Sequence, residues 1–314
     1  MNPIQSALAA IAFAPAITFE NLTMVSLLAK EPDPASRIPH PDYVLLDDAL
    51  ASGGAEITEL SKQGSVPELR FVNRGRTPVL IIDGQELLGA KQNRIVNLTI
   101  LAPPETTMTI PVSCVESGRW SARSRAFAAA PQTQYASGRA KRVAQVTQSI
   151  VDYGERRSDQ SAVWADIAAT SARLSASSST GAMEAIFDRH SAFIDRCVDA
   201  FKPLDRQVGV MFAVNDSIVG LDLFDDAATL ARVLPKLVRA AAVDALDRSS
   251  EPRADSTVST RACQLFLAHV SSAAQHSARA VGLGEDVRLS SPSIAGAALV
   301  VNDAVVHLAA FVSG

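Results

Sequence analysis

Cysteine is scarce in this chain, and its scarcity bears on the redox environment. The 314 residues include three cysteines, at positions 114, 197 and 263, which are widely spaced and odd in number. Domains held together by disulfides normally carry an even number of closely spaced cysteines. We therefore expect reduced thiols in a cytoplasmic protein.

A strong excess of either charge is also missing. The 29 basic and 33 acidic residues leave a formal net charge of −4, so no global positive field attracts nucleic acid. The first basic residue is Lys30, so the apolar run at 8–16 lacks the positive segment of a signal peptide. That run is too short to span a bilayer. We expect a lead-in helix or an arm there, and no membrane segment.

Familiar catalytic and cofactor motifs are absent as well. The sequence has no Walker phosphate loop, no G-x-G-x-x-G and no G-x-S-x-G. None of its five histidines shows the spacing of metal ligands, and His307 lies in an apolar run typical of a hydrogen-bonded core residue. We predict neither a cofactor nor a bound metal.

The chain is instead rich in short strand patterns, separated by Gly, Asn, Asp and Pro. Such close spacing of strands and turns is typical of an antiparallel sandwich or barrel. Before residue 120 the predicted strands are 17–28, 43–51, 57–60, 69–73, 79–83, 94–101 and 108–115. Two later hairpins are predicted, 208–216 with 217–224 and 297–301 with 304–310. The proline-rich stretch 30–42 and the polar stretch 249–256 are expected to be loops.

Helical spacing of apolar residues marks the middle of the chain. The predicted helices are 137–153, 161–174, 181–201 and 226–246, with Thr180 as the N-cap of the third. Pro235 is expected to kink or restart the fourth helix. Residues 263–270 fit either a helix or a strand.

These elements predict an α+β fold with an antiparallel β-sandwich or barrel-like core and an inserted helical segment. The strands at the two ends of the chain cannot bury their apolar faces alone. We therefore expect one domain over 13–314, with its β core at 17–120, 208–224 and 278–312. The helical insertion would span about 137–202, and a further helix about 226–246.

Polar residues gather at the ends of two strands between positions 83 and 120. Because strand side chains alternate between faces, Arg94 should share the buried face of Val96, and Glu116 that of Val112 and Cys114. If the strands run antiparallel, Arg94 and Glu116 lie near the same end of the core. A buried charge needs a partner there.

Two interpretations of this polar cluster stay open. In the first, it is a pocket for a small anionic ligand, in which Lys91, Arg94 and Arg119 hold the anion. Gln92 and Asn93 would orient the ligand, Trp120 would offer a stacking face, and Glu86 or Glu116 would act as general acid or base. In the second, the charges are structural, and an exposed helical face around 128–151 meets a protein partner.

Two neighbouring features also bear on ligand chemistry. No carboxylate lies between Glu116 and Asp152, whereas six basic residues do, which fits an anionic partner or a solvated face. They are Arg119, Arg123, Arg125, Arg139, Lys141 and Arg142. Cys114 precedes Arg119 by five positions, the spacing of a sulfurtransferase-type anion loop, although a buried structural cysteine is the alternative.

The cluster lies within a pattern that resembles a known family. The segments DGQELLGAKQNRIVN and IPVSCVESGRW, followed by QVGVMFAVNDSIVGLDLF and VVHLAAF, resemble the ARG and rhodanese-phosphatase-superfamily-associated protein family. The family's name records gene neighbourhoods with ADP-ribosylglycohydrolases and rhodanese-like phosphatases, and its activity is not established. The resemblance implies a link to ADP-ribose, nucleotide or phosphate metabolism. Where the family has a carboxylate pair, this chain has Gln85–Glu86, so only Glu86 carries over.

Overall fold

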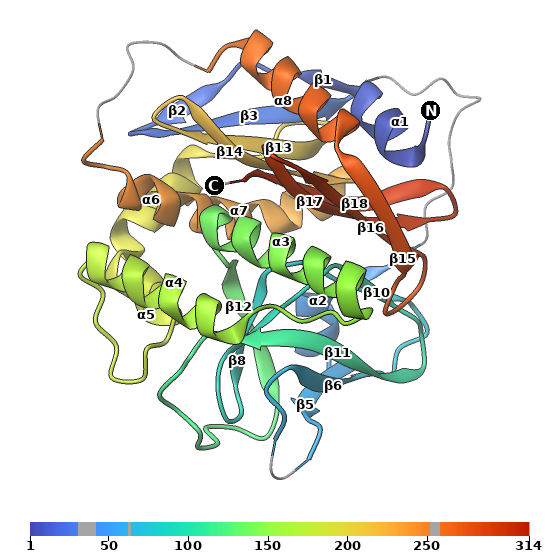
Figure 1. Ribbon diagram of the computed structural model, residues 1–314, viewed down its shortest axis with the longest axis vertical. Helices are drawn as coiled ribbons and strands as arrows, with labels where there is room; N and C mark the ends of the chain where they lie inside the picture. The colour runs from blue at the N-terminus through green and yellow to red at the C-terminus, as the bar shows by residue number, and fades with distance from the viewer. Residues whose placement is uncertain (31–41, 62–63, 252–257, 314) are drawn as a thin grey trace.

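A broad antiparallel sheet and two smaller sheets organise the protein, with helices between and around them (Figure 1). The structure, a computed structural model, describes residues 1–30, 42–61, 64–251 and 258–313. The broad sheet has the order β1 (Ile11–Phe13), β3 (Leu22–Ala29), β13 (Gln207–Val214), β14 (Ser217–Phe224), β18 (Ala304–Val312), β17 (Ile294–Val301), β16 (Glu285–Ser291) and β15 (Ala274–Arg279); β2 (Ile17–Phe19) also pairs with β3. The predicted α+β class and the two predicted hairpins are confirmed.

The smaller sheets curl into a half-barrel around their own apolar core. One has the order β12 (Phe127–Thr133), β8 (Gln85–Gly89), β9 (Arg94–Val96), β11 (Thr106–Cys114), β6 (Glu68–Asn73) and β5 (Ala55–Glu59). The other has β10 (Ile100–Ala102), β7 (Val79–Ile81) and β4 (Val44–Leu45), beside helix α2 (Leu46–Ala51). Their core holds Ile57, Phe71, Val96 and Val112. The strands of the expected β core thus divide between two groups of sheets, and the single domain over 13–314 stays a prediction.

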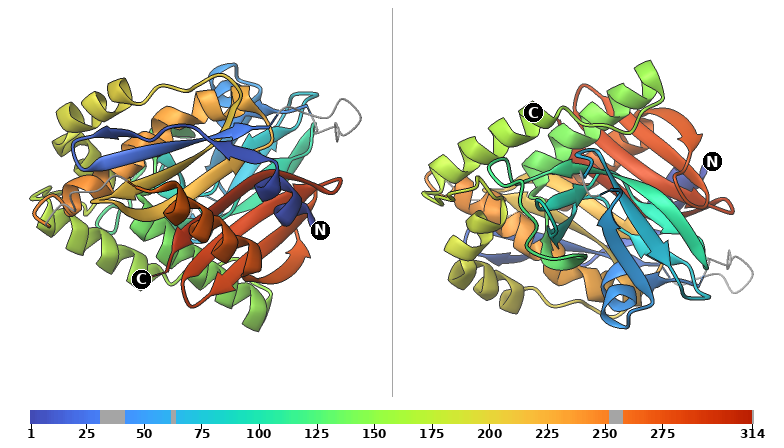
Figure 2. Two further views of the ribbon diagram at one scale, coloured as in Figure 1. Left: turned by 90° about the horizontal axis from the view of Figure 1, so that it is seen from above. Right: turned by 90° about the horizontal axis from the view of Figure 1, so that it is seen from below.

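Helices cover both faces of the broad sheet (Figure 2). Helices α1 (Pro3–Ala9) and α8 (Thr260–Ser272) pack on one face, where Ile4 and Phe266 join the cluster of Leu27 and Leu221. Helices α3 (Ala136–Tyr153) and α7 (Ala227–Asp247) lie on the other face, towards the half-barrel. Burial on both faces explains the unbroken apolar run in β13.

The remaining helices correct two predictions. The helix expected over 181–201 is two helices, α5 (Glu184–Arg189) and α6 (Ser191–Ala200), separated at His190. Thr180 is not an N-cap, because its hydroxyl donates a hydrogen bond to the Glu116 carboxylate (2.8 Å) instead. The backbone around Thr180 pairs with the chain after β11 through Gly118 N–H (2.8 Å). The helical spacing of apolar residues in the sequence cannot predict these long-range contacts.

Three other helical predictions can be compared with the structure. Helix α7 continues through Pro235, so no new helix begins there. Packing against strands and helices on both sides outweighs the roughly 3 kcal/mol cost of an internal proline. Residues 263–270 are helical within α8, and 161–174 closely match α4 (Gln160–Arg173). The loops predicted at 30–42 and 249–256 fall largely outside the described residues.

A buried ionic network joins the broad sheet to the half-barrel through α3. Arg139 donates to both oxygens of Asp222 (3.0 and 2.8 Å) and to Asp83 (3.2 Å). Arg142 donates to the other oxygen of Asp83 (2.7 Å). Burial favours neutral carboxyls, but the charges of Arg139 and Arg142 hold the pKa values of Asp83 and Asp222 below their usual range. These two arginines are therefore neither solvated nor turned towards a ligand.

His307 completes this network as a core histidine, as expected. Its Nε2 lies 3.0 Å from Asp222 and its Nδ1 lies 2.7 Å from Thr99 Oγ1. The backbone N–H of Asp83 donates to that same hydroxyl (3.1 Å), so Thr99 links His307 to Asp83. The Thr–His–Asp order resembles a nucleophile triad, but all three side chains are buried. The arrangement is structural.

Candidate functional site

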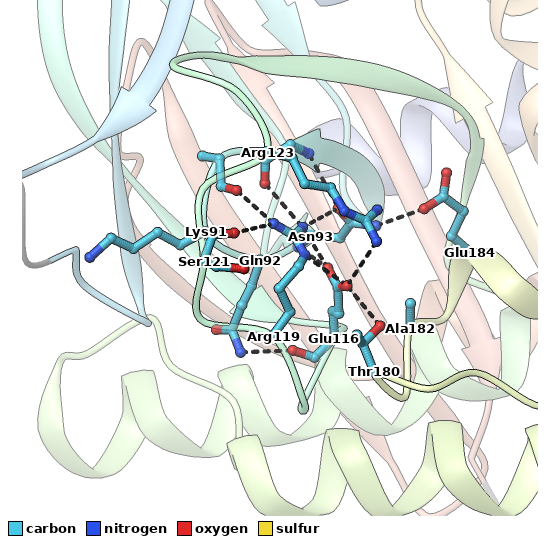
Figure 3. A network of polar contacts seen from close by, with 12 residues as sticks. Lys91, Gln92, Asn93, Glu116, Arg119, Ser121, Arg123, Thr180, Ala182 and Glu184 are labelled. Carbon is cyan, nitrogen blue, oxygen red and sulfur yellow. Dashed lines mark hydrogen bonds and ion pairs between the residues drawn. The ribbon is translucent and has the colours of Figure 1, made fainter.

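The candidate site forms where the turn between β8 and β9 meets the chain after β11 (Figure 3). Strands β9 and β11 run antiparallel, with Arg94 opposite Cys114 and Val96 opposite Val112. The N–H of Val115 then donates to Asn93 (3.0 Å), so the pairing extends into the turn. The predicted juxtaposition of the two polar segments is therefore present.

Glu116 and Arg119 form the centre of a dense hydrogen-bond network (Figure 3). Arg119 Nε and Nη2 donate to the two oxygens of Glu116 (2.8 and 2.6 Å), the bidentate geometry that suits a guanidinium and a carboxylate. Its remaining donors contact Ala90 O (2.6 Å), Ser121 O (2.9 Å) and Asn93 Oδ1 (3.2 Å). Arg119 thus ties the two turns together with its whole guanidinium.

The two oxygens of the Glu116 carboxylate already accept hydrogen bonds from three residues. Besides Arg119 it accepts hydrogen bonds from the Asn93 N–H (3.1 Å) and the Thr180 hydroxyl (2.8 Å). Burial opposes ionisation, but these hydrogen bonds outweigh burial and hold the pKa of Glu116 below its usual range. A carboxylate in this state does not readily take up or release a proton. The geometry therefore favours a structural ion pair for Glu116.

Gln92 and Asn93 brace the same turn. Gln92 donates to the backbone oxygen of Glu116 (2.7 Å), and Asn93 donates to the Glu184 carboxylate (3.1 Å) at the start of α5. Both amides are buried. Their hydrogen bonds are made to the protein, so they position the site rather than face an open cavity.

Arg94 differs from Arg119 because its guanidinium is incompletely paired. The side chain has 0% exposure, and only Nη1 finds acceptors, on Gln92 (3.0 Å) and the Asn93 backbone (3.4 Å). Nε and Nη2 have no hydrogen-bond partner among the described residues. The Glu59 carboxylate lies 4.0 Å from Nη2. Burial lowers the pKa of this guanidinium, which marks the cost of keeping it charged there.

Trp120 and Lys91 lie beside Arg94. The Trp120 ring centroid is 5.9 Å from the Arg94 guanidinium and 5.0 Å from Lys91 Nζ, within cation–π range. Trp120 is 49% exposed, so the ring reaches solvent. Gly64 packs against both side chains, since a Cβ there would lie 3.1 Å from Lys91 and 3.3 Å from Trp120. The partly buried Lys91, the half-exposed Trp120 ring and the buried Arg94 guanidinium thus lie side by side.

Glu86 lies apart from these groups. It pairs with Ile95 across β8 and β9, whereas Leu87 pairs with Arg94, so Glu86 and Arg94 face opposite sides of the sheet. Gln132 donates to one Glu86 oxygen (2.8 Å), and the other oxygen has no partner among the described residues. Burial, aided by the charge of Glu184, raises the pKa of Glu86 to about 8. Glu86 is therefore mostly protonated at neutral pH.

Cys114 shows the geometry of a structural cysteine. It is fully buried opposite Arg94, and its backbone exchanges two hydrogen bonds with the Gln160 side chain (2.8 Å each). Burial raises the pKa of its thiol, although the Arg94 charge acts in the opposite direction. An anion-binding loop needs an accessible thiolate and free backbone N–H groups. Neither is present at Cys114.

Three residues that complete the site were not predicted as site residues from the sequence: Glu59, Thr180 and Glu184. Strand parity could have found Glu59, because it continues the buried face of Ala55 and Ile57 to the end of β5. Thr180 and Glu184 come from the distant segment before α5. Their contacts with Glu116 and Asn93 depend on the tertiary fold, so no local sequence pattern predicts them.

A structural role for Glu116 gives the first prediction. The Glu116→Gln variant should lose about 2–4 kcal/mol of unfolding free energy, because the new amide group would face the donors of Arg119, Asn93 or Thr180. Urea unfolding followed by circular dichroism measures this loss. Glu155→Gln is the matched control, since its ion pair with Arg157 is exposed and should change stability by less than about 0.5 kcal/mol. Equal stability of the two variants would refute the structural role.

These observations define a mixed α+β protein with a charged, aromatic-flanked cluster at one end of a half-barrel. The chain belongs to the ARG and Rhodanese-Phosphatase-superfamily-associated Protein domain family, whose model matches residues 10–311. The family assignment made from the sequence segments is thus confirmed. No curated protein and no solved structure matches the chain.

Two kinds of feature are absent from the part of the chain that the structure describes. In that part, no helix is long and apolar enough to cross a membrane. The same residues contain no group of three or more His, Cys, Asp or Glu side chains placed to hold a metal ion.

Proposed function

We propose that this protein binds a small anionic ligand of the nucleotide or ADP-ribose type at Arg94, Lys91 and Trp120. The observation that carries the proposal is the incomplete pairing of Arg94. A fully buried guanidinium with two unpartnered nitrogens is costly. A phosphate or carboxylate that reaches those nitrogens offsets the cost and gains charge-assisted hydrogen bonds.

The surroundings of Arg94 suit such a ligand. Lys91 adds a second positive charge, and Trp120 presents a half-exposed ring against which a flat group can pack. Glu59 and the anion would compete for Arg94, so the 4.0 Å separation leaves Glu59 as a weak partner that a ligand can displace. Gln92 and Asn93 orient Arg94 and Arg119 by accepting hydrogen bonds from them. Arg119 in turn fixes the turn between β8 and β9.

Glu116 holds the site together, and Glu86 is on the far side of the sheet, so we assign neither of them a proton transfer at Arg94.

The family's gene neighbourhood, with ADP-ribosylglycohydrolases and rhodanese-like phosphatases, supports the phosphate-bearing class of ligand by association. Cys114, Cys197 and Cys263 are free and buried, which supports a cytoplasmic location. We propose no nucleic-acid partner.

A thermal-shift screen tests the anion site. AMP, ADP-ribose, ribose 5-phosphate, succinate and inorganic phosphate are the probes, and at least one should raise Tm by about 2 °C or more at saturating concentration. The Arg94→Met variant should abolish that shift. It should itself fold, because the change removes an incompletely paired buried charge.

Arg125→Gln is the matched control, because Arg125 is exposed and no hydrogen bond or ion pair joins it to the site among the described residues. It should keep the full ligand shift. The proposal fails if no probe stabilises the wild-type protein, or if Arg94→Met responds as the wild type does. The first of these outcomes would favour the non-catalytic interaction module instead. The exposed Val151 and Tyr153 at the end of α3 would then be its natural contact surface.

A further inference from the structure

A groove separate from the charged cluster lies between α4 and the segment 174–181. Its volume is about 500 Å³, within the range of small-molecule sites in proteins. One wall is the α4 face that carries Trp164, Ala168 and Ser171. The opposite wall is built from Ser177, Ser178 and their neighbours, and Ser117 lies at one end.

The wall chemistry of this groove contrasts with that of the charged cluster. None of its lining residues is charged, whereas the cluster around Arg94 has several charged groups within a few ångströms. Apolar surface predominates, supplied by the half-buried indole of Trp164 with Ile167 and three alanines. A phosphate or carboxylate would find no counter-charge in this groove.

Serine hydroxyls supply the polar part of the groove. Five serines line it, and the hydroxyls of Ser117, Ser171 and Ser177 make no hydrogen bond to any described residue. A hydroxyl both donates and accepts, so it matches a ligand edge that carries donors and acceptors together. An aliphatic chain would leave these hydroxyls unused, and so would a plain hydrocarbon ring.

The loop wall is held firmly in place. Ser178 Oγ accepts the Ala182 N–H (3.1 Å), and Thr180 bonds to Glu116 on the other side of the segment. Gly181 has a positive φ of 60°, and a Cβ there would come within 2.7 Å of Ser117 Oγ. Only glycine lets the segment approach Ser117 so closely, and the groove is therefore preformed.

We propose that this groove binds an uncharged, flat heteroaromatic ring whose edge carries hydrogen-bond donors and acceptors, the chemistry of a nucleoside. The ring packs against Trp164 and the alanines, and its edge contacts the serine hydroxyls. The inference goes beyond the anion site and does not depend on it. Adenosine without phosphate, followed through Trp164 in a Trp120→Phe background, reports the groove, and inorganic phosphate reports the anion site.

Fluorescence tests the groove directly. The chain has two tryptophans, so Trp120→Phe leaves Trp164 as the single indole reporter. Adenosine, guanosine, cytidine and uridine are titrated into this full-length variant. At least one of them should change Trp164 emission saturably, whereas ribose and inorganic phosphate should not.

Two variants of α4 serve as the matched pair. Ala168→Phe fills the groove, and Ala169→Phe adds the same side chain on an exposed position outside it. Ala168→Phe should weaken nucleoside binding by about tenfold or more, and Ala169→Phe should leave it within about twofold. If Ala168→Phe does not fold, Ala172→Phe fills the same groove from the next turn.

The inference is wrong if no nucleoside alters Trp164 emission up to millimolar concentration. It is equally wrong if the groove-filling variant binds as tightly as Ala169→Phe. Loss of the phosphate response in Arg94→Met with an intact nucleoside response would show that the groove binds independently of the anion site. A protein that responds to phosphate through Arg94 but to no nucleoside would refute the groove and leave the anion site.

Discussion

The Asp222→Asn variant is expected to lose about 3–5 kcal/mol of unfolding free energy, a large part of the stability of a typical domain. Asp222 accepts two hydrogen bonds from Arg139 and one contact from His307, all buried. A neutral amide removes the negative charge and leaves the Arg139 guanidinium with Asp83 alone, which Arg142 already shares. Urea unfolding at pH 7, followed by circular dichroism, measures the loss.

The same variant should show a definite pH dependence. The pKa of Asp222 is held below its usual value near 3.8, because the Arg139 charge outweighs the effect of burial. A depressed pKa contributes stability that is present above the unfolded-state pKa and is lost as pH falls towards the folded-state pKa. The difference between wild type and Asp222→Asn should therefore shrink as the pH is lowered below about 4.

Asp199→Asn provides the control, because its ion pair with Lys202 is exposed and should matter by less than about 0.5 kcal/mol. Combining Asp222→Asn with Arg139→Met should cost less than the sum of the two single changes, since each removes the other's unpaired charge. Additive losses, or a loss no larger than that of Asp199→Asn, would show that the network does not couple the sheets as its geometry implies.

This network shows what the sequence could not supply about the fold. Strand and helix patterns predicted the α+β class, both late hairpins and the main helices, because their signals are local. Arg139 and Arg142 look like part of a basic run on a solvated helix. Only the tertiary arrangement brings Asp83 and Asp222, from two different groups of sheets, against that face. The run therefore suggested an anionic partner that lies within the protein itself.

The alternation of side chains along a strand explains which contacts of the site could be predicted from the sequence and which could not. It placed Arg94 on the buried face beside Cys114 and brought the two polar turns together, as the register shows. It left Glu116 without its true partners, because Arg119 and Thr180 lie outside the regular strands. The separation of Glu86 from Arg94 depends on the register of β8 against β9, which parity within a single strand does not give. Grouping residues by their closeness in sequence hid that separation.

Glu86→Gln should stabilise the protein at alkaline pH, an unusual outcome for a change at a fully buried residue. Burial and nearby carboxylates raise the pKa of Glu86 from 4.5 to about 8. Between these values the folded state binds the extra proton, so stability falls as pH rises. The shift corresponds to a penalty of up to about 5 kcal/mol at pH 9. Glutamine resembles the neutral acid and avoids the penalty, while Gln132 still finds a carbonyl oxygen to donate to.

The measurement is urea unfolding of both proteins at pH 4, 7 and 9. The gain from Glu86→Gln should be close to zero at pH 4, where the carboxyl is neutral in the folded state and mostly neutral in the unfolded state. It should be largest at pH 9. Glu285→Gln, on the exposed side of β16, should show no such trend. A Glu86→Gln variant that is less stable than wild type at pH 9 would mean that Glu86 is ionised and paired. The Glu184→Gln variant gives an independent check, because removing that charge should lower the pKa of Glu86 and reduce the alkaline loss of stability in the wild-type background.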